Sequence, residues 1–211
     1  HYPVKLAGQV SFSKNGLIAF TIGDSLHLSD GRKLNLGTYS NLAPLSPDGN
    51  TVAFNDNNDQ IHLLNLITKQ RIQITNSDHS YYFPQWSPDG KYLLIIRFDG
   101  QLCTYNLQNN RLHILTEGHS PTWQDNETII FYKKEIQQMQ LINTDIYSIK
   151  ANGSGLQQLT FTKDKFETSP AIKINTGEIL YNTLHSNTIS TLSATPVLNK
   201  KPGTFYQEQI G

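Results

Sequence analysis

Apolar residues fall in short runs that alternate with clusters of Asn, Asp, Ser and Gly along the 211-residue chain. Runs such as NTVAF (50–54), KYLLIIRF (91–98) and TIIFY (128–132) are typical of β-strands. No segment of about twelve residues carries a convincing helical stripe. The nearest, KKEIQQMQLIN (133–143), stands between strand-like runs and is expected to be an inserted loop. The pattern therefore predicts an all-β protein.

The strand-like runs recur behind a common turn. Residues 46–49 and 87–90 both read Ser-Pro-Asp-Gly, and their glycines lie 41 positions apart. Proline presets φ, aspartate bonds its own backbone and glycine tolerates a positive φ, so this sequence favours a tight turn. Weaker copies of the turn and strand begin at Ser13, Gln124 and Lys173, which makes five units.

A second segment follows each turn and strand. Residues 61–75, 102–116 and 146–160 align without a gap, and each ends in an apolar residue followed by Thr. Each segment reads as two short strands joined by a polar turn, and residues 26–36 form a shortened copy. One complete unit therefore contains four strands.

These units resemble the propeller repeat of TolB-type proteins, which also occurs in tricorn-like and prolyl-oligopeptidase-like peptidases. The best match is PQWSPDGKYLLI (84–95) with the hairpin after it, and the resemblance covers residues 6–193 approximately. It implies a β-propeller of four-stranded antiparallel blades. It says little about function, because propellers carry unrelated activities.

Counting strands predicts how the ring closes. The last unit has three strands, and residues 2–6 (YPVKL) read as an orphan fourth strand in front of the first unit. We therefore expect five blades, closed by pairing of the N-terminal strand with the last blade; the alternative is an open fragment of a larger propeller. The expected propeller spans residues 1–194, and 195–211 read as a linker or C-terminal tail. The repeats are expected at about residues 10–36, 43–75, 84–116, 121–160 and 170–193, the last completed by 2–6.

The sequence assigns no catalytic residue. The strands expected to line the channel read QVSFS, LAPLS, FPQWS, SPTWQ and SPAIKI, and none contains Asp, Glu or His. Glycosidases need paired carboxylates, and serine hydrolases of the α/β type need a G-x-S-x-G elbow, which the chain lacks. Acids expected on loops, such as Asp78, Glu117 and Glu167, remain able to converge. We expect no enzyme activity from this chain.

Metal and cofactor chemistry also finds no support. Asn55 to Asp59 lacks the Gly and the distal Glu of an EF-hand loop, and no histidines show metal-ligand spacing. The one cysteine, Cys103, cannot form an internal disulfide. It shares its repeat position with His27, His62 and Tyr147, which predicts a partly buried strand site. We expect no metal and no cofactor.

Charge and hydropathy argue against nucleic acid and membrane as partners. Seventeen basic and seventeen acidic side chains cancel, so the chain lacks the positive field that holds nucleic acid. No stretch approaches the roughly 18 apolar residues of a membrane helix, so membrane insertion is not expected.

The loops between blades carry most of the chemistry that remains. These segments (37–43, 76–84, 117–121 and 161–170) concentrate aromatic side chains among polar ones, which is typical of interface anchors. Strand order places the insertion 133–143 on the same face, as a wall beside them. Some of these aromatics, such as Phe83 and Phe161, have an alternative role as plugs of the channel. The candidate binding residues are Tyr39, His79, Tyr81, Tyr82, His119, Phe161 and Phe166.

We therefore predict a noncatalytic β-propeller module that binds a protein or peptide, as part of a larger periplasmic, cell-surface or secreted protein. Two alternatives stay open. One is a carbohydrate-binding or glycoside-acting propeller, since aromatics and amides suit sugar rings and hydroxyls. The other is a substrate-gating propeller of a peptidase whose catalytic domain lies outside this chain.

Deletion of residues 2–6 tests the closed ring. If they supply the missing strand, their loss leaves two raw sheet edges, and the thermal unfolding midpoint should fall severely. In an open fragment the same deletion should change the midpoint very little. Thermal unfolding of the chain with and without these residues, followed by circular dichroism, separates the two.

Overall fold

The computed structural model describes residues 7–163, 165–173, 175–185 and 188–195. These residues contain eighteen β-strands and no helix, which confirms the all-β prediction. The chain divides into two compact units, residues 1–114 and 115–211. Residues 1–6, the expected closing strand, lie outside the described residues, so the five-bladed closed ring stays a prediction.

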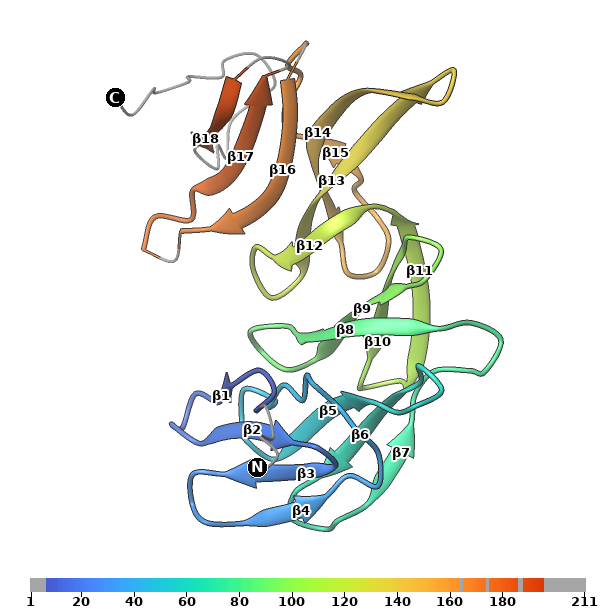
Figure 1. Ribbon diagram of the computed structural model, residues 1–211, viewed down its shortest axis with the longest axis vertical. Helices are drawn as coiled ribbons and strands as arrows, with labels where there is room; N and C mark the ends of the chain where they lie inside the picture. Colours follow the sequence, from blue (N-terminus) through green and yellow to red (C-terminus); the bar gives the residue numbers. More distant parts are fainter. Residues whose placement is uncertain (1–6, 164, 174, 186–187, 196–211) are drawn as a thin grey trace, which may run out of the picture. The chain divides into compact units, whose positions relative to one another are not determined.

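The first unit is built from consecutive antiparallel sheets (Figure 1). One contains β1 (Ser11–Phe12), β2 (Ile18–Ile22), β3 (Ser25–Leu28) and β4 (Lys33–Asn35). The next contains β5 (Thr51–Asn55), β6 (Ile61–Asn65) and β7 (Arg71–Gln73). The third contains β8 (Tyr81–Trp86), β9 (Tyr92–Arg97), β10 (Gln101–Asn106) and β11 (Arg111–Glu117).

The middle sheet has three strands because its expected inner strand, LAPLS (42–46), is reduced to a single bridge between Leu45 and Val52. Pro44 has no N–H to give to a ladder. Its carbonyl accepts the indole N–H of Trp86 at 2.9 Å, and so links this sheet to the third.

The second unit forms one continuous sheet. Its strands are β12 (His119–Trp123), β13 (Thr128–Gln137), β14 (Gln140–Lys150), β15 (Gln157–Gln158), β16 (Lys165–Ile172), β17 (Ile179–His185) and β18 (Thr188–Thr195). All pairings are antiparallel except that of β14 with β16, which is parallel and pairs Thr144 with Phe166.

The prediction that residues 133–143 form an inserted loop is wrong, because these residues extend the hairpin of β13 and β14. Ile136 pairs with Leu141, and Gln137 pairs with Gln140 at the tip. Apolar residues opposite one another stabilise a strand pair, which accounts for a hairpin here.

The Ser-Pro-Asp-Gly turns are closed by one serine hydroxyl each. Ser87 Oγ accepts the backbone N–H of Tyr92 at 3.0 Å and donates to Asp89 Oδ1 at 2.8 Å. The same Asp89 oxygen accepts the N–H of Lys91, and Gly90 N–H donates to the carbonyl of Ser87. Gly90 has φ +75°, a conformation that glycine adopts without strain. Ser87, Asp89 and Gly90 of the motif therefore each have a role in joining β8 to β9.

The other copies that contain a serine repeat this arrangement, whereas those that begin at Gln124 and Lys173 contain none. Ser46 Oγ accepts the N–H of Thr51 at 2.9 Å and donates to Asp48, and Ser13 Oγ accepts the N–H of Leu17 at 3.0 Å. The recurring turn in the sequence is thus a recurring set of hydrogen bonds.

The threonine that ends the long repeats also has a structural role. Thr75 Oγ1 accepts the backbone N–H of Ile61 at 2.9 Å, and Thr160 Oγ1 accepts that of Ile146 at 2.8 Å. Both threonines are buried. Each one ties the end of the outer segment back to a neighbouring strand, to the start of β6 for Thr75 and to the interior of β14 for Thr160.

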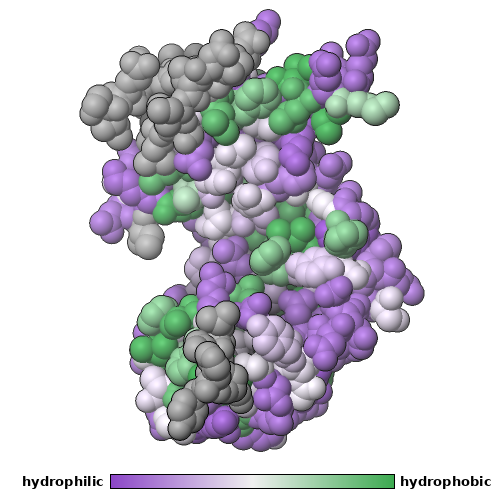
Figure 2. Space-filling model, in the orientation of Figure 1, coloured by the Kyte–Doolittle hydropathy of each residue, from purple (hydrophilic) through white to green (hydrophobic). Residues whose placement is uncertain are grey.

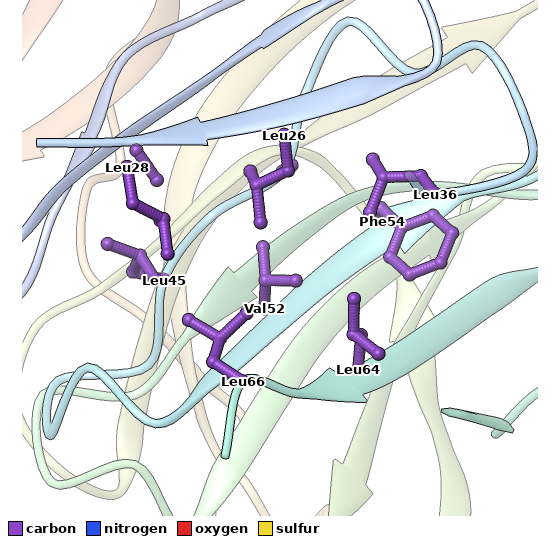
Figure 3. Close-up of a cluster of buried hydrophobic side chains, with 10 residues drawn as sticks. Leu26, Leu28, Leu36, Leu45, Val52, Phe54, Leu64 and Leu66 are labelled. Carbon is purple, nitrogen blue, oxygen red and sulfur yellow. The ribbon is translucent and has the colours of Figure 1, made fainter. Parts of the chain in front are cut away.

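The core of the first unit lies between neighbouring sheets. Consecutive side chains of β5 and β6 are buried. Because alternate side chains of a strand point to opposite sides, both faces of these strands are covered. Ala53, Ile61 and Leu63 join a cluster with residues of β8 to β10. The opposite face of β5 and β6 packs on the first sheet (Figure 3) through Leu26, Leu28, Leu36, Leu45, Val52, Phe54, Leu64 and Leu66.

Removing the hydroxyl of Ser87 tests the turn. Ser87→Ala removes the acceptor of the partly buried N–H of Tyr92, and we expect a loss of about 1–3 kcal/mol in unfolding free energy. Ser154→Ala is the matched control, since Ser154 Oγ donates only to Asn152 in an exposed turn. Urea unfolding should show a change below about 0.5 kcal/mol for the control. Equal losses in both variants would contradict the role given to Ser87.

Candidate functional site

Three loops interlock at one end of the sheets of the first unit. They are the β5–β6 turn (56–60), the connection from β7 to β8 (74–80) and the β9–β10 turn (98–100). Tyr81 N–H donates to the carbonyl of Asp59 at 2.8 Å, and Phe98 N–H donates to that of Ser80 at 2.9 Å. Gln60 Nε2 donates to the carbonyl of His79 at 2.8 Å. These hydrogen bonds therefore join the three loops into one surface.

Exposed aromatic side chains cover this end. Phe98 is 79% exposed, and Phe83 is 67% exposed. The ring of Tyr82 lies 6.1 Å from that of Phe98, and its hydroxyl donates to Asp59 Oδ2 at 2.8 Å. We call Tyr82, Phe83 and Phe98 the aromatic surface.

A β-bulge presents Phe83. The register of β8 on β9 shifts between Tyr82 and Gln85, and Phe83 has φ +54°. This left-handed conformation is rare for a bulky residue. Because the bulge carries the strand past Pro84, β8 begins at Tyr81 rather than at the expected repeat boundary at residue 84.

The bulge recurs in two other inner strands. Ser120 and Ser169, each also followed by proline, have φ +46° and +52° and lie at register shifts in β12 and β16. Bulges with such residues re-aim a side chain. Only at Phe83 is that side chain aromatic.

Three of the predicted binding residues meet at this surface. Tyr82 belongs to it, and the exposed ring of His79 meets Tyr81 edge-on at 6.4 Å. Tyr81 is 2% exposed and donates to Asn76 Oδ1, so it supports the surface from beneath. Tyr39 is exposed on the 36–44 connection, where its hydroxyl donates to Asn41.

The other three predicted residues lie in the second unit. His119 is partly buried on β12, with its ring 5.1 Å from that of Tyr132. Burial, and then the charge of Lys134, lower the pKa of His119. Phe161 is exposed, and Phe166 is partly buried on β16. Sequence reasoning missed Phe98, whose signal was a phenylalanine directly before the Asp-Gly of a turn.

The β13–β14 hairpin carries a separate apolar surface in the second unit (Figure 2). Its exposed residues are Ile136, Met139, Leu141 and Ile142. At the tip, Gln138 and Met139 both have a positive φ, of 48° and 62°. That pair of angles usually selects Asn and Gly, so the tip carries local strain. Its predicted role as a wall beside the binding loops stays a prediction.

The repeat position of Cys103 is a structural site, as predicted. Across the ladder, Cys103 faces Ile95, whereas His27 stacks on Phe20 and His62 on Phe54. Cys103 is fully buried, and burial raises the pKa of its thiol to about 11. A buried thiol that stays protonated is a poor nucleophile.

His62 has the partners of a catalytic histidine but no free nitrogen. Its Nε2 lies 2.9 Å from Asp56 Oδ2, and Arg71 Nε donates to its Nδ1 at 3.2 Å. Because a guanidinium only donates, Nδ1 must be the acceptor, and Nε2–H therefore donates to Asp56. Arg71 also donates to the carbonyl of Leu36 at 2.6 Å. The group therefore links neighbouring sheets and has no base to offer a substrate.

Two acids are buried together in the second unit. Glu167, expected on a loop, lies in β16 and is 1% exposed. Its Oε1 accepts the hydroxyl of Thr162 at 2.9 Å, and its Oε2 has no hydrogen-bond partner. Thr162 N–H points at Asp145 Oδ1, 3.4 Å away. Burial is the largest cause that raises the pKa of both carboxyls.

Among the described residues, no group of three or more His, Cys, Asp or Glu side chains is placed to hold a metal ion. The described part of the chain also has no helix long and apolar enough to cross a membrane.

Comparison with solved structures identifies the fold. No family model matches the chain, and no curated protein matches it. The chain is similar to putative TolB from Agrobacterium tumefaciens (TM-score 0.58, 16% identity, 96% of this chain and 80% of that one). It is also similar to the tricorn protease (0.72, 14%, 94% and 22%) and to oligogalacturonate lyase in complex with manganese (0.62, 14%, 90% and 62%). The chain spans less than two thirds of the last two. The fold is a TolB-like β-propeller, as predicted.

Replacing Glu167 tests the buried carboxyl. Because its folded pKa is raised, the folded chain binds the proton more tightly, and stability falls as pH rises from the unfolded value of about 4.3 through the folded one. Glu167→Gln should unfold at a higher temperature than the unmodified chain at pH 8 and show little difference at pH 4. The pKa of Asp145 is also raised, so Asp145 also lowers stability as pH rises. Part of the pH dependence of stability should therefore persist in Glu167→Gln.

Glu178→Gln is the control for this pH series. Its carboxyl lies near the surface, and hydrogen bonds from Lys173 and then Thr176 lower its pKa. The effect of this carboxyl on stability therefore has the opposite pH dependence. A pH-independent effect of Glu167→Gln would contradict the raised pKa, because stability depends on pH only where the folded and unfolded chains bind different numbers of protons.

Proposed function

We propose that this chain is a noncatalytic propeller module that binds a protein or peptide through the aromatic surface. The observation that carries the proposal is the exposure of Phe98 and Phe83 at the end where three loops interlock. Interface hot spots are enriched in aromatic anchors, and a preorganised surface loses little entropy on binding.

The groups that most resemble catalytic ones support a noncatalytic role. Cys103 is buried with a raised pKa, and both ring nitrogens of His62 are engaged. A nucleophile and a base need to lie within hydrogen-bond reach of each other and of a substrate.

The module is proposed to work inside a larger protein of the periplasm, cell surface or extracellular space. This chain spans 22% of the tricorn protease, so a propeller of this kind can be a small part of a longer chain. The same similarity supports the alternative, in which the propeller controls the access of substrates to a peptidase domain outside this chain.

A carbohydrate-binding or glycoside-acting propeller is the second candidate. The similarity to oligogalacturonate lyase favours it, together with the exposed aromatics, because ring faces stack on sugars. A glycan array and a panel of chromogenic glycosides separate the two. Binding to sugars without turnover would favour the first half of this alternative, and turnover would rule out the noncatalytic role.

The principal test uses peptides selected from a random phage-displayed library on the immobilised chain. Phe98→Ala and Tyr82→Ala should each weaken the selected peptides by about tenfold, because a buried aromatic anchor contributes 1–2 kcal/mol or more. Phe12→Ala is the control, since Phe12 on β1 is as exposed as Phe83, at 67%. Unchanged affinity in both aromatic variants, measured by isothermal titration calorimetry, would rule out this surface.

A further inference from the structure

The net charge of zero conceals an uneven distribution within the first unit. Around the aromatic surface, the three interlocked loops carry three aspartates outside the His62 group, Asp59, Asp78 and Asp99. Arg97, at the end of β9, is the one cation beside them in the described loops. The surface is therefore locally acidic.

The turns at the opposite ends of these strands carry both signs of charge, because Asp30, Asp48 and Asp89 stand there beside the basic residues. The β1–β2 and β8–β9 turns contain Lys14 and Lys91, and the β3–β4 and β6–β7 turns contain Arg32 and Lys69. Consecutive antiparallel strands alternate in direction, so these turns gather at the end away from the aromatic surface.

Arg97 does not offset the acidic character at the exterior. Its guanidinium donates to both oxygens of Asp99, at 2.8 and 2.6 Å. The Arg97 side chain is 13% exposed, whereas that of Asp99 is 49% exposed. The cation is recessed, and the carboxylate faces outward beside Phe98. The hydrogen bond from Arg97 is the largest cause that lowers the pKa of Asp99, so this carboxylate stays ionised.

Asp59 lies equally close to an aromatic ring. Its Oδ2 accepts the Tyr82 hydroxyl, and this hydrogen bond is the largest cause that raises the pKa of Tyr82. Phe98 stands 6.1 Å from the same ring. Carboxylates and aromatic faces thus alternate over a short distance.

Building on the proposed function, we propose that the segment bound at the aromatic surface is basic, presenting Lys or Arg side chains to Phe98 and Tyr82 between Asp59 and Asp99. An ammonium or guanidinium within about 6 Å of a ring face is attracted by the ring quadrupole. Carboxylates beside the ring attract the same cation, steer its approach and repel acidic partners. A neutral apolar partner would use the rings and gain nothing from the carboxylates.

The test compares three fluorescein-labelled peptides of about nine residues, in which glycine alternates with lysine, glutamine or glutamate. We expect the lysine peptide to bind at least about fivefold tighter than the glutamine peptide, and the glutamate peptide to bind weakest. Raising the salt concentration should reduce the preference, because exposed charges are screened. Fluorescence anisotropy titrations give the three affinities.

Matched variants assign the preference to this surface. Asp99→Asn should lower the lysine-to-glutamine ratio about twofold to threefold, and Phe98→Leu should lower it while keeping an apolar side chain. Asp30→Asn is the control for charge, because Asp30 is also exposed and paired with an arginine, Arg32, but lies in the β3–β4 turn. Phe12→Leu is the control for the ring.

The outcomes separate this inference from the proposed function. The basic partner alone is overturned by two results together. The lysine and glutamine peptides bind with nearly equal affinity, and the library-selected peptides depend on Phe98 but are not rich in Lys or Arg. A library that yields no peptide dependent on Phe98 overturns the proposed function as well. A ratio that falls in Asp99→Asn and Phe98→Leu but not in their controls supports the inference.

Discussion

The serine hydroxyl that closes the first turn in each repeat of the first unit (Ser13, Ser46 and Ser87) is the interaction on which the rest of that unit depends. Ser87 Oγ accepts the N–H of Tyr92 and donates to Asp89, which fixes how the first strand of the sheet turns into the second. With the turn fixed, the register follows, and Trp86 pairs with Leu93. Register decides which side chains face the neighbouring sheet, because a slip of one residue would turn every side chain to the other face.

This constraint explains how much of the fold the sequence could predict. The Ser-Pro-Asp-Gly turns and the terminal threonines are local signals, and both bond the backbone of their own repeat. The shared position of Cys103, His27 and His62 was equally readable, since equal spacing places it at the same point of each ladder. The hairpin at 133–143 was not readable, because its polar glutamines mask the cross-strand pairing of Ile136 with Leu141.

The candidate site was less predictable for a physical reason. Exposure depends on contacts between loops that are distant in sequence, as in the hydrogen bond from Gln60 to the carbonyl of His79. Tyr81 and Tyr82 are adjacent and chemically alike, yet one packs in the core and the other faces outward, since neighbouring strand residues point to opposite sides. Phe83 adds a further change, because its bulge breaks that alternation. Composition pointed to loops rich in aromatic residues, but it could not tell which of those residues are exposed.

The two ends of the strands are thus subject to different physical constraints. At the end of the serine turns, each side chain is used to close a turn, and substitution costs stability. At the other end, main-chain hydrogen bonds such as that from Phe98 N–H to the carbonyl of Ser80 and side-chain hydrogen bonds such as that from Gln60 to the carbonyl of His79 both hold the loops. The exposed rings of Phe83 and Phe98 lie outside these contacts and are accessible to a partner. Exposed phenylalanines lower solubility, and neighbouring ionised aspartates repel one another, and neither contributes to the core. Phe98 is 79% exposed, and the carboxylate of Asp99 is 49% exposed even though it accepts hydrogen bonds from Arg97 and from the N–H of Gln101, so both groups are accessible for the binding role that we propose.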